Sequence, residues 1–172
     1  MTSPEGLAPY DDMRRWVVIH ARPRCEKKLS DFCEARHIPV FLPMIKRRHR
    51  YGARIRVFDI PLFAGYVFVL ADHAQLMTLR QNQRVANVLV VSDQETLLRQ
   101  LNHIKCALVN QESLELFPQL GEGMKVSVRS GPLKGVEGFV HKIKSKTRIV
   151  LNVDFIQQAV SVEVDADWLV PV

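Results

Sequence analysis

The most apolar and most aromatic run of the chain is residues 61–70, PLFAGYVFVL. From Gly65 onward this run is rich in Val and aromatic residues, which predicts a strand that is mostly buried. Neighbouring residues of a strand point to opposite faces of a sheet, so Phe63, Tyr66 and Phe68 cannot all face one core. We therefore expect at least one of these aromatic side chains near the surface, in a docking patch for another protein. The alternative is that they are core residues of a central strand.

The spacing of apolar residues predicts further elements on both sides of this run. Helices are expected where apolar residues recur every three to four positions, and strands where apolar residues alternate with polar ones or run together. The predicted strands are 15–20, 40–45, 54–58 and 85–91, and the predicted helices are 24–37, a short helix capped by Asp72, and a helix that follows residues 92–95. This order is typical of an α+β fold of the split βαβ kind, in which helices pack on an antiparallel sheet.

The pattern changes after residue 120. Five short strands are predicted at regular spacing, which is typical of a small β-barrel. They are 124–129, 136–143, 147–153, 159–164 and 168–170. The preceding stretch is polar and weakly patterned, as in a linker. The predicted organisation is a disordered leader at 1–13, an N-terminal domain at 14–109, a linker at 110–120 and a barrel domain at 121–172.

Positive charge is concentrated in one segment of the 172-residue chain, whose formal net charge is +6. Six cationic residues occur between residues 46 and 56, and no acidic residue lies between Glu34 and Asp59. With a turn at Tyr51-Gly52, this segment is predicted to form a hairpin with a basic tip. Such a cluster favours contact with a polyanion, and the alternative is a solvated charged loop. The six are Lys46, Arg47, Arg48, Arg50, Arg54 and Arg56.

Other classes of protein find little support in the sequence. The three cysteines form no C-x-x-C pair and the six histidines have no metal-ligand spacing, so we expect neither a disulfide framework nor a metal site. There is no phosphate-binding Gly-rich loop and no nucleophile elbow, so we expect no enzymatic activity and no cofactor. No apolar run approaches the roughly 20 residues that span a membrane, and a cytoplasmic monomer is expected.

Several motifs resemble one known family. The sequences WVV in the first strand, RPRCEKK at 22–28 and PLFAGYVFV at 61–69 resemble the N-terminal (NGN) domain of NusG-type transcription elongation factors. Residues 123–140 resemble the KOW motif of the SH3-like C-terminal barrel in that family. One departure is Ala64, where the family usually has Pro. Another is 156–163, IQQAVSVE, where the housekeeping members have Phe-Gly-Arg-x-Thr-Pro-Val-Glu. Together these features are closest to the specialised antitermination paralogues of the UpxY and RfaH type.

The resemblance implies a set of partners. The N-terminal domain would dock on the clamp helices of RNA polymerase and reduce pausing, through His20, Lys28, Phe63, Tyr66 and Phe68. The hairpin would contact upstream DNA and the displaced non-template strand, through Lys46, Arg47, Arg48, Arg50, Tyr51 and Arg54. The barrel would contact ribosomal protein S-ten through Phe155 and Ile156, and the lack of an aromatic anchor at Ile156 argues against binding of Rho. The alternative is a ribosome-associated or general RNA-binding KOW protein.

Overall fold

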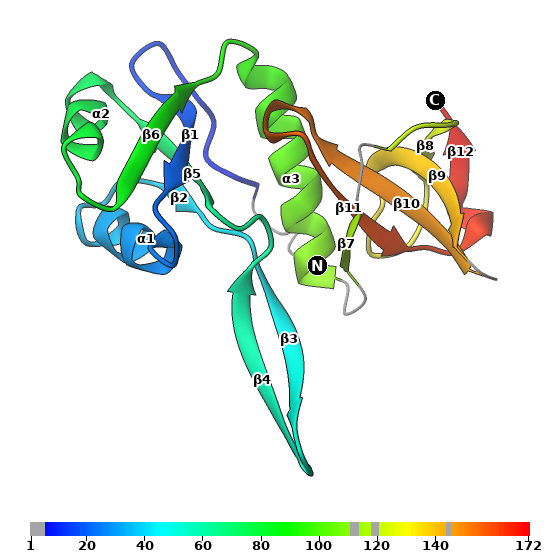
Figure 1. Cartoon of the computed structure of the whole chain (residues 1–172). Coiled ribbons are helices and arrows are strands. Elements are labelled where there is room, and N and C mark those ends of the chain that lie inside the picture. The colour runs from blue at the N-terminus through cyan, green and yellow to red at the C-terminus, as the bar shows by residue number, and fades with distance from the viewer. Residues whose placement is uncertain (1–5, 111–113, 118–120, 144–145) are drawn as a thin grey trace. The chain divides into compact units, whose positions relative to one another are not determined.

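A computed structural model describes residues 6–110, 114–117, 121–143 and 146–172. The contacts divide these residues into two compact units, one of residues 7–95 and one of residues 96–172 together with Gly6 (Figure 1). Among the described residues, no helix is both long enough and apolar enough to span a membrane.

The unit of residues 7–95 is built on a four-stranded antiparallel sheet. Its strand order is β2-β5-β1-β6, and its central strands β1 and β5 are paired from Arg15↔Ala71 to His20↔Tyr66. The strands are β1 (Arg15–Ala21), β2 (Val40–Phe41), β5 (Tyr66–Ala71) and β6 (Val85–Val90). The predicted antiparallel sheet is therefore confirmed.

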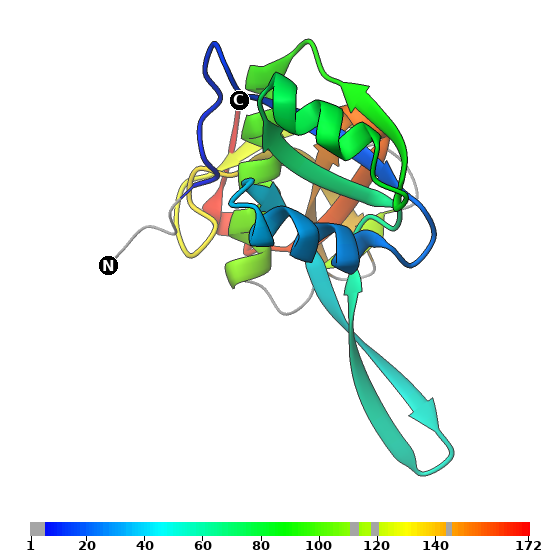
Figure 2. The same cartoon turned by 90° about the vertical axis from the view of Figure 1, so that its left-hand side faces the viewer.

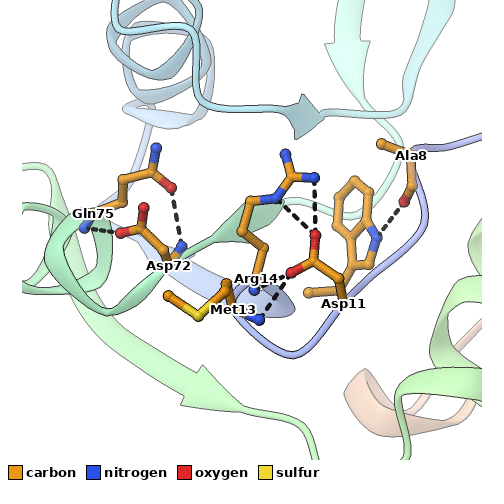
Figure 3. A network of polar contacts seen from close by, with 7 residues as sticks. Ala8, Asp11, Met13, Arg14, Asp72 and Gln75 are labelled. Carbon is orange, nitrogen blue, oxygen red and sulfur yellow. Dashed lines mark hydrogen bonds and ion pairs between the residues drawn. The ribbon is translucent and has the colours of Figure 1, made fainter.

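One face of this sheet is covered by α1 (Glu26–Ala35) and α2 (His73–Arg80), as Figure 1 shows. The buried residues beneath these helices occupy alternate positions of the strands, including Val17, Ile19, Val67 and Val69. The predicted helix start at Asp72 is confirmed. Its carboxylate accepts a hydrogen bond from Gln75 N, and the Gln75 side chain accepts one from Asp72 N (Figure 3).

The other face of the sheet carries the alternate set of side chains. Trp16, Val18, Phe68 and Leu70 are all fully buried there. Gln94 fixes the chain beside β1: its Oε1 accepts from Trp16 N at 2.7 Å, and its Nε2 donates to Trp16 O at 2.8 Å.

The segment before β1 is also held by polar contacts. Trp16 Nε1 donates to Ala8 O at 2.9 Å. The carboxylate of Asp11 accepts from the backbone N–H groups of Met13 and Arg14 (Figure 3). These bonds close the turn that leads into the sheet.

A separate two-stranded sheet consists of β3 (Met44–Tyr51) and β4 (Arg54–Pro61), which confirms the predicted hairpin. Its two-residue loop is Gly52-Ala53, one residue later than the predicted turn at Tyr51-Gly52, because Tyr51 pairs with Arg54 at the end of β3. Gly52 has a φ of +58°. A Gly at the first loop position is what a type II′ hairpin turn requires, since this residue has positive φ.

The unit of residues 96–172 contains most of α3 (Gln94–Asn110) and a six-stranded antiparallel sheet. The strand order is β12-β8-β9-β10-β11-β7. Its strands are β7 (Glu115–Phe117), β8 (Lys125–Val128), β9 (Glu137–Ile143), β10 (Lys146–Val153), β11 (Gln158–Glu163) and β12 (Leu169–Pro171). Five of them correspond to the predicted strands.

The sixth strand, β7, comes from the stretch predicted to be a linker, and it pairs with β11. Residues 111–113 and 118–120 of that predicted linker lie outside the described residues, as do residues 1–5 of the predicted leader. Two short 3-10 helices, η1 (Asp154–Ile156) and η2 (Ala166–Trp168), follow β10 and precede β12.

Candidate nucleic-acid and protein interfaces

The β3–β4 hairpin is the most exposed part of its unit. Every residue from 46 to 59 is exposed, and within the described part of the chain β3 and β4 pair only with each other. Figures 1 and 2 both show the hairpin extending away from α1 and from the four-stranded sheet. Two contacts hold its base: Leu62 N donates to Pro43 O at 2.8 Å, and Lys27 Nζ donates to Asp59 O. Both faces of the hairpin are therefore open to a ligand.

The register of the hairpin divides the predicted nucleic-acid-binding residues between these two faces. Directly paired residues of an antiparallel ladder share a face, and successive residues alternate. The pairing Tyr51↔Arg54 and Arg47↔Phe58 places Arg47, Tyr51 and Arg54 on one face. Lys46, Arg48 and Arg50 lie on the other face.

Three further residues share the face of Tyr51. Arg56 belongs to the predicted cluster of cations but was not among the predicted binding residues, and the other two, His49 and Phe58, were not identified by charge. The rings of His49 and Tyr51 make an edge-to-face contact, with centroids 4.7 Å apart. The alternation of residue types along β3 and β4 was the signal that would have grouped them.

The hairpin carries one acidic side chain among residues 46–59. Asp59 lies opposite Lys46, so it belongs to the face that does not hold Tyr51. Hence the face with Arg47, Arg54 and Arg56 holds three guanidinium groups and no carboxylate. Guanidinium groups bind phosphates through charge and through directed hydrogen bonds.

A second candidate surface lies at paired ends of β1 and β5. His20 and Tyr66 are direct cross-strand partners, and their rings stack with centroids 5.5 Å apart and an interplanar angle of 24°. His20 is exposed and Tyr66 is half-buried. The expectation that one aromatic residue of the 61–70 run lies near the surface is confirmed by Tyr66. Lys28 is exposed on α1.

The turn that leads into this surface is held by a residue that the sequence did not single out. Gly65 has a φ of +86°, and its N–H donates to Glu26 Oε1 at 2.9 Å. Gly65 O accepts from Ala21 N at 2.8 Å. The Glu26 side chain is only 8% exposed, so the carboxylate is a buried acceptor at the start of α1. Glu26 thus joins α1 to the residue before Tyr66.

The structure corrects the expected docking role of Phe63 and Phe68. These side chains are 1% and 0% exposed, and their rings meet edge to face with centroids 6.4 Å apart. Phe41 packs against Phe68 as well. A side chain enclosed in this way belongs to the core and offers no surface to a partner. The alternative interpretation of these residues as core residues holds for both phenylalanines, Phe68 within β5 and Phe63 in the bend that precedes it.

The two residues predicted to contact a ribosomal protein or Rho differ in how far they are exposed to solvent. Phe155, in η1, is 41% exposed, whereas Ile156 is 6% exposed. The expected contact through the Ile156 side chain is therefore corrected, since that side chain is buried. Gln157 follows in the left-handed conformation, with a φ of +56°.

The described residues contain no group of three or more His, Cys, Asp or Glu side chains arranged to hold a metal ion. Cys25, Cys33 and Cys106 are free thiols. Burial raises the pKa of Cys33 to about 11, so this thiol is a packing residue of α1.

A comparison with protein-family models gives one match, to the family described as "NusG: Transcription termination factor nusG", over residues 14–115. The match spans more than half of the chain, and it includes the four-stranded sheet, the hairpin, and both of the surfaces around Tyr51 and Tyr66. A search of curated proteins found no match.

Proposed function

The chain belongs to the NusG family, and we propose that it is a transcription elongation and antitermination factor that binds RNA polymerase. The observation that carries this proposal is the basic hairpin within the family-matched part of the chain, which is exposed at every residue from 46 to 59. A segment with six cationic residues and one acid suits the phosphates of DNA or RNA near a polymerase.

The proposed polymerase contact uses the surface of His20 and Tyr66. An aromatic ring that is partly buried at its base and open at its edge is typical of interface hot spots. Exposed Lys28, on α1 of the same unit, adds a positive charge for an acidic partner. We propose that this surface docks on the clamp helices of the polymerase, and that Phe63 and Phe68 support it from the core.

The proposed nucleic-acid contact uses the hairpin. Its cations would hold phosphates of the upstream DNA and of the displaced non-template strand. Holding these strands near the polymerase would oppose the rearrangements that lead to pausing or termination. The hairpin would thus add affinity for the elongation complex beyond that of the protein surface.

For the unit of residues 96–172 we propose a KOW-type, SH3-like barrel that binds a protein. The six antiparallel strands suit such a barrel, and exposed Phe155 beside β10 offers an anchor for ribosomal protein S-ten. The run at 156–163 supports a place among the specialised paralogues of the UpxY and RfaH type. In this proposal the factor can couple the polymerase to a ribosome.

The first test is co-purification of the full chain with bacterial core RNA polymerase, followed by transcription of a long template. We expect binding and reduced pausing. The variant His20→Ala/Tyr66→Ala should lose at least about tenfold in affinity, because hot-spot truncations typically cost 2 kcal/mol or more. The matched control, Tyr10→Ala/His73→Ala, removes the same two residue types from other exposed positions of the unit. A wild-type chain that neither binds polymerase nor alters pausing would reject the proposal.

The second test measures how salt affects association with the elongation complex. Replacing Arg47, Arg48 and Arg50 with Gln should reduce the slope of log affinity against log salt by about 2–3, since each lost phosphate contact contributes roughly 0.7–0.9. An unchanged slope would show that the hairpin is merely solvated. A control with the same loss of charge uses three exposed arginines outside the hairpin. These are Arg22, Arg80 and Arg84.

A further inference from the structure

We propose that the hairpin binds unpaired nucleobases on one face only, the face formed by Arg47, His49, Tyr51, Arg54, Arg56 and Phe58. We call this the ring face, and we call the opposite face, with Lys46, Arg48, Arg50, Ile55, Val57 and Asp59, the aliphatic face. The ligand is a single-stranded nucleic acid whose bases stack on the rings. This inference rests on the proposed function, because it names the class of ligand for the same hairpin.

The two faces follow from the register of β3 and β4. The pairs Arg47↔Phe58, His49↔Arg56 and Tyr51↔Arg54 point to the ring face. The pairs Lys46↔Asp59, Arg48↔Val57 and Arg50↔Ile55 point to the aliphatic face. Every ring of the exposed hairpin therefore lies on one side.

The rings are open to solvent. Tyr51 is 54% exposed and Phe58 is 42% exposed, and His49 is exposed as well. The edge-to-face contact between His49 and Tyr51 fixes the relative orientation of two of these rings. Successive side chains on one face of a strand are about 6.6–6.8 Å apart. The ring face thus presents a row of flat surfaces along the length of the hairpin.

Charge on the ring face favours a polyanion. Arg47, Arg54 and Arg56 alternate with the rings, and the acidic side chain Asp59 lies on the other face. Aromatic rings between cations are the usual combination in sites for single-stranded nucleic acids, where bases stack and cations hold the backbone. A duplex keeps its bases stacked on each other and offers no base face to these rings, so the ring face selects unpaired strands.

The aliphatic face provides a built-in comparison. Its exposed apolar side chains, Ile55 at 65% and Val57 at 54%, match or exceed the rings in exposure but have no π-system. Arg50 on this face donates one of its five N–H groups, that of Nε, to Gly52 O at 2.9 Å. This face can attract a backbone but cannot stack on bases.

The experiment measures binding of the full chain to labelled oligonucleotides of about 12 nucleotides, a length within the range of known single-strand sites. The probes are oligodeoxythymidine, oligouridine and a duplex DNA of the same length. We expect Tyr51→Ala/Phe58→Ala to bind the single strands at least about tenfold more weakly than the wild type. The matched control Ile55→Ala/Val57→Ala should bind within about threefold of it. The comparison of DNA with RNA identifies which strand is preferred.

Three results would overturn the inference. They are a wild-type chain that fails to bind single strands, wild-type binding to duplex as tight as to single strands, and equal losses from the ring-face and aliphatic-face variants. The variant Tyr51→Phe/Phe58→Tyr keeps both rings, so retained binding separates stacking from any general damage to the hairpin. The assay contains no polymerase. A chain that binds polymerase but shows no ring-face effect refutes this inference alone, whereas failure to bind polymerase refutes the proposed function.

Discussion

Replacing Glu26 with Ala should loosen the turn that precedes Tyr66. Glu26 Oε1 is the acceptor for Gly65 N, at 2.9 Å, and the side chain is buried. A hydrogen bond to a charged group contributes about 1.5–3 kcal/mol, and a part-buried N–H left without its partner loses that amount. Since about 1.4 kcal/mol corresponds to a factor of ten, the Gly65 amide should open roughly 10- to 150-fold more often.

The conservative change Glu26→Gln should have a smaller effect. Its amide oxygen can still accept from Gly65 N, and a neutral hydrogen bond contributes about 0.5–1.5 kcal/mol. We therefore expect the opening of the Gly65 amide to rise less in Glu26→Gln than in Glu26→Ala. Glu26 holds the turn before Tyr66, and the ring of His20 stacks on Tyr66, so the proposed polymerase surface depends on this turn. We therefore expect affinity for polymerase to fall less in Glu26→Gln than in Glu26→Ala.

Amide hydrogen exchange measured by NMR on the full chain reports the Gly65 N–H directly. The control is Glu34→Ala, which removes an exposed carboxylate from the same helix. Protection of Gly65 in Glu26→Ala within about twofold of the wild type would refute the role of Glu26. The same loss of protection in Glu34→Ala would show that the effect comes from α1 as a whole.

Four further outcomes follow from burial and backbone conformation. Cys33, whose pKa is raised to about 11 by burial, should resist alkylation in the folded chain while half-buried Cys25 reacts, as mass spectrometry of labelled peptides would show. Burial lowers the pKa of His103 below its ordinary value of 6.5, so its protonation favours the unfolded state. Stability should therefore fall as the pH drops below that value, and His103→Asn should flatten the decline in thermal unfolding between about pH 8 and pH 5. Gln157→Gly should raise the free energy of unfolding by up to about 1 kcal/mol in denaturant titrations, since left-handed backbone costs a non-Gly residue about 1–2 kcal/mol and the flexibility of Gly offsets part of that gain. Phe63→Ala should destabilise the chain by about 3–5 kcal/mol, which thermal unfolding would detect.

Local sequence signals predicted most of the elements, because those signals act over a few residues. The run of Val and aromatic residues in β5 and the cap at Asp72 are examples, and both lie where they were expected. The role of Glu26 was out of reach, since its partner is 39 residues away along the chain and the contact forms only when α1 packs beside β5. The burial of Phe68 likewise depends on tertiary contacts, since Phe41 and Phe63 both pack against its ring.

The face on which each candidate residue of the hairpin lies was not predictable, because the candidates were chosen by charge. Charge identified Arg47 and Arg54, but it also included Lys46, Arg48 and Arg50 from the opposite face. A two-residue loop fixes the register of a hairpin, and the register fixes both faces. The position of the loop, at Gly52-Ala53 rather than at the predicted Tyr51-Gly52, was therefore the missing piece of information.

The arrangement of charge in the hairpin supports the proposal of a polyanionic ligand, because stability alone does not require it. An isolated two-stranded hairpin is marginally stable, and like charges directly opposite each other destabilise it further. The register avoids this: each Lys or Arg faces an acidic, aromatic or aliphatic residue, and none faces another Lys or Arg. More acidic residues would stabilise the hairpin further, yet it carries one, at its base. A segment that keeps six cations apart, with a single acid among them, is suited to bind the phosphates of a nucleic acid. The rings gathered on one face would let the bases of a single strand stack beside those phosphates.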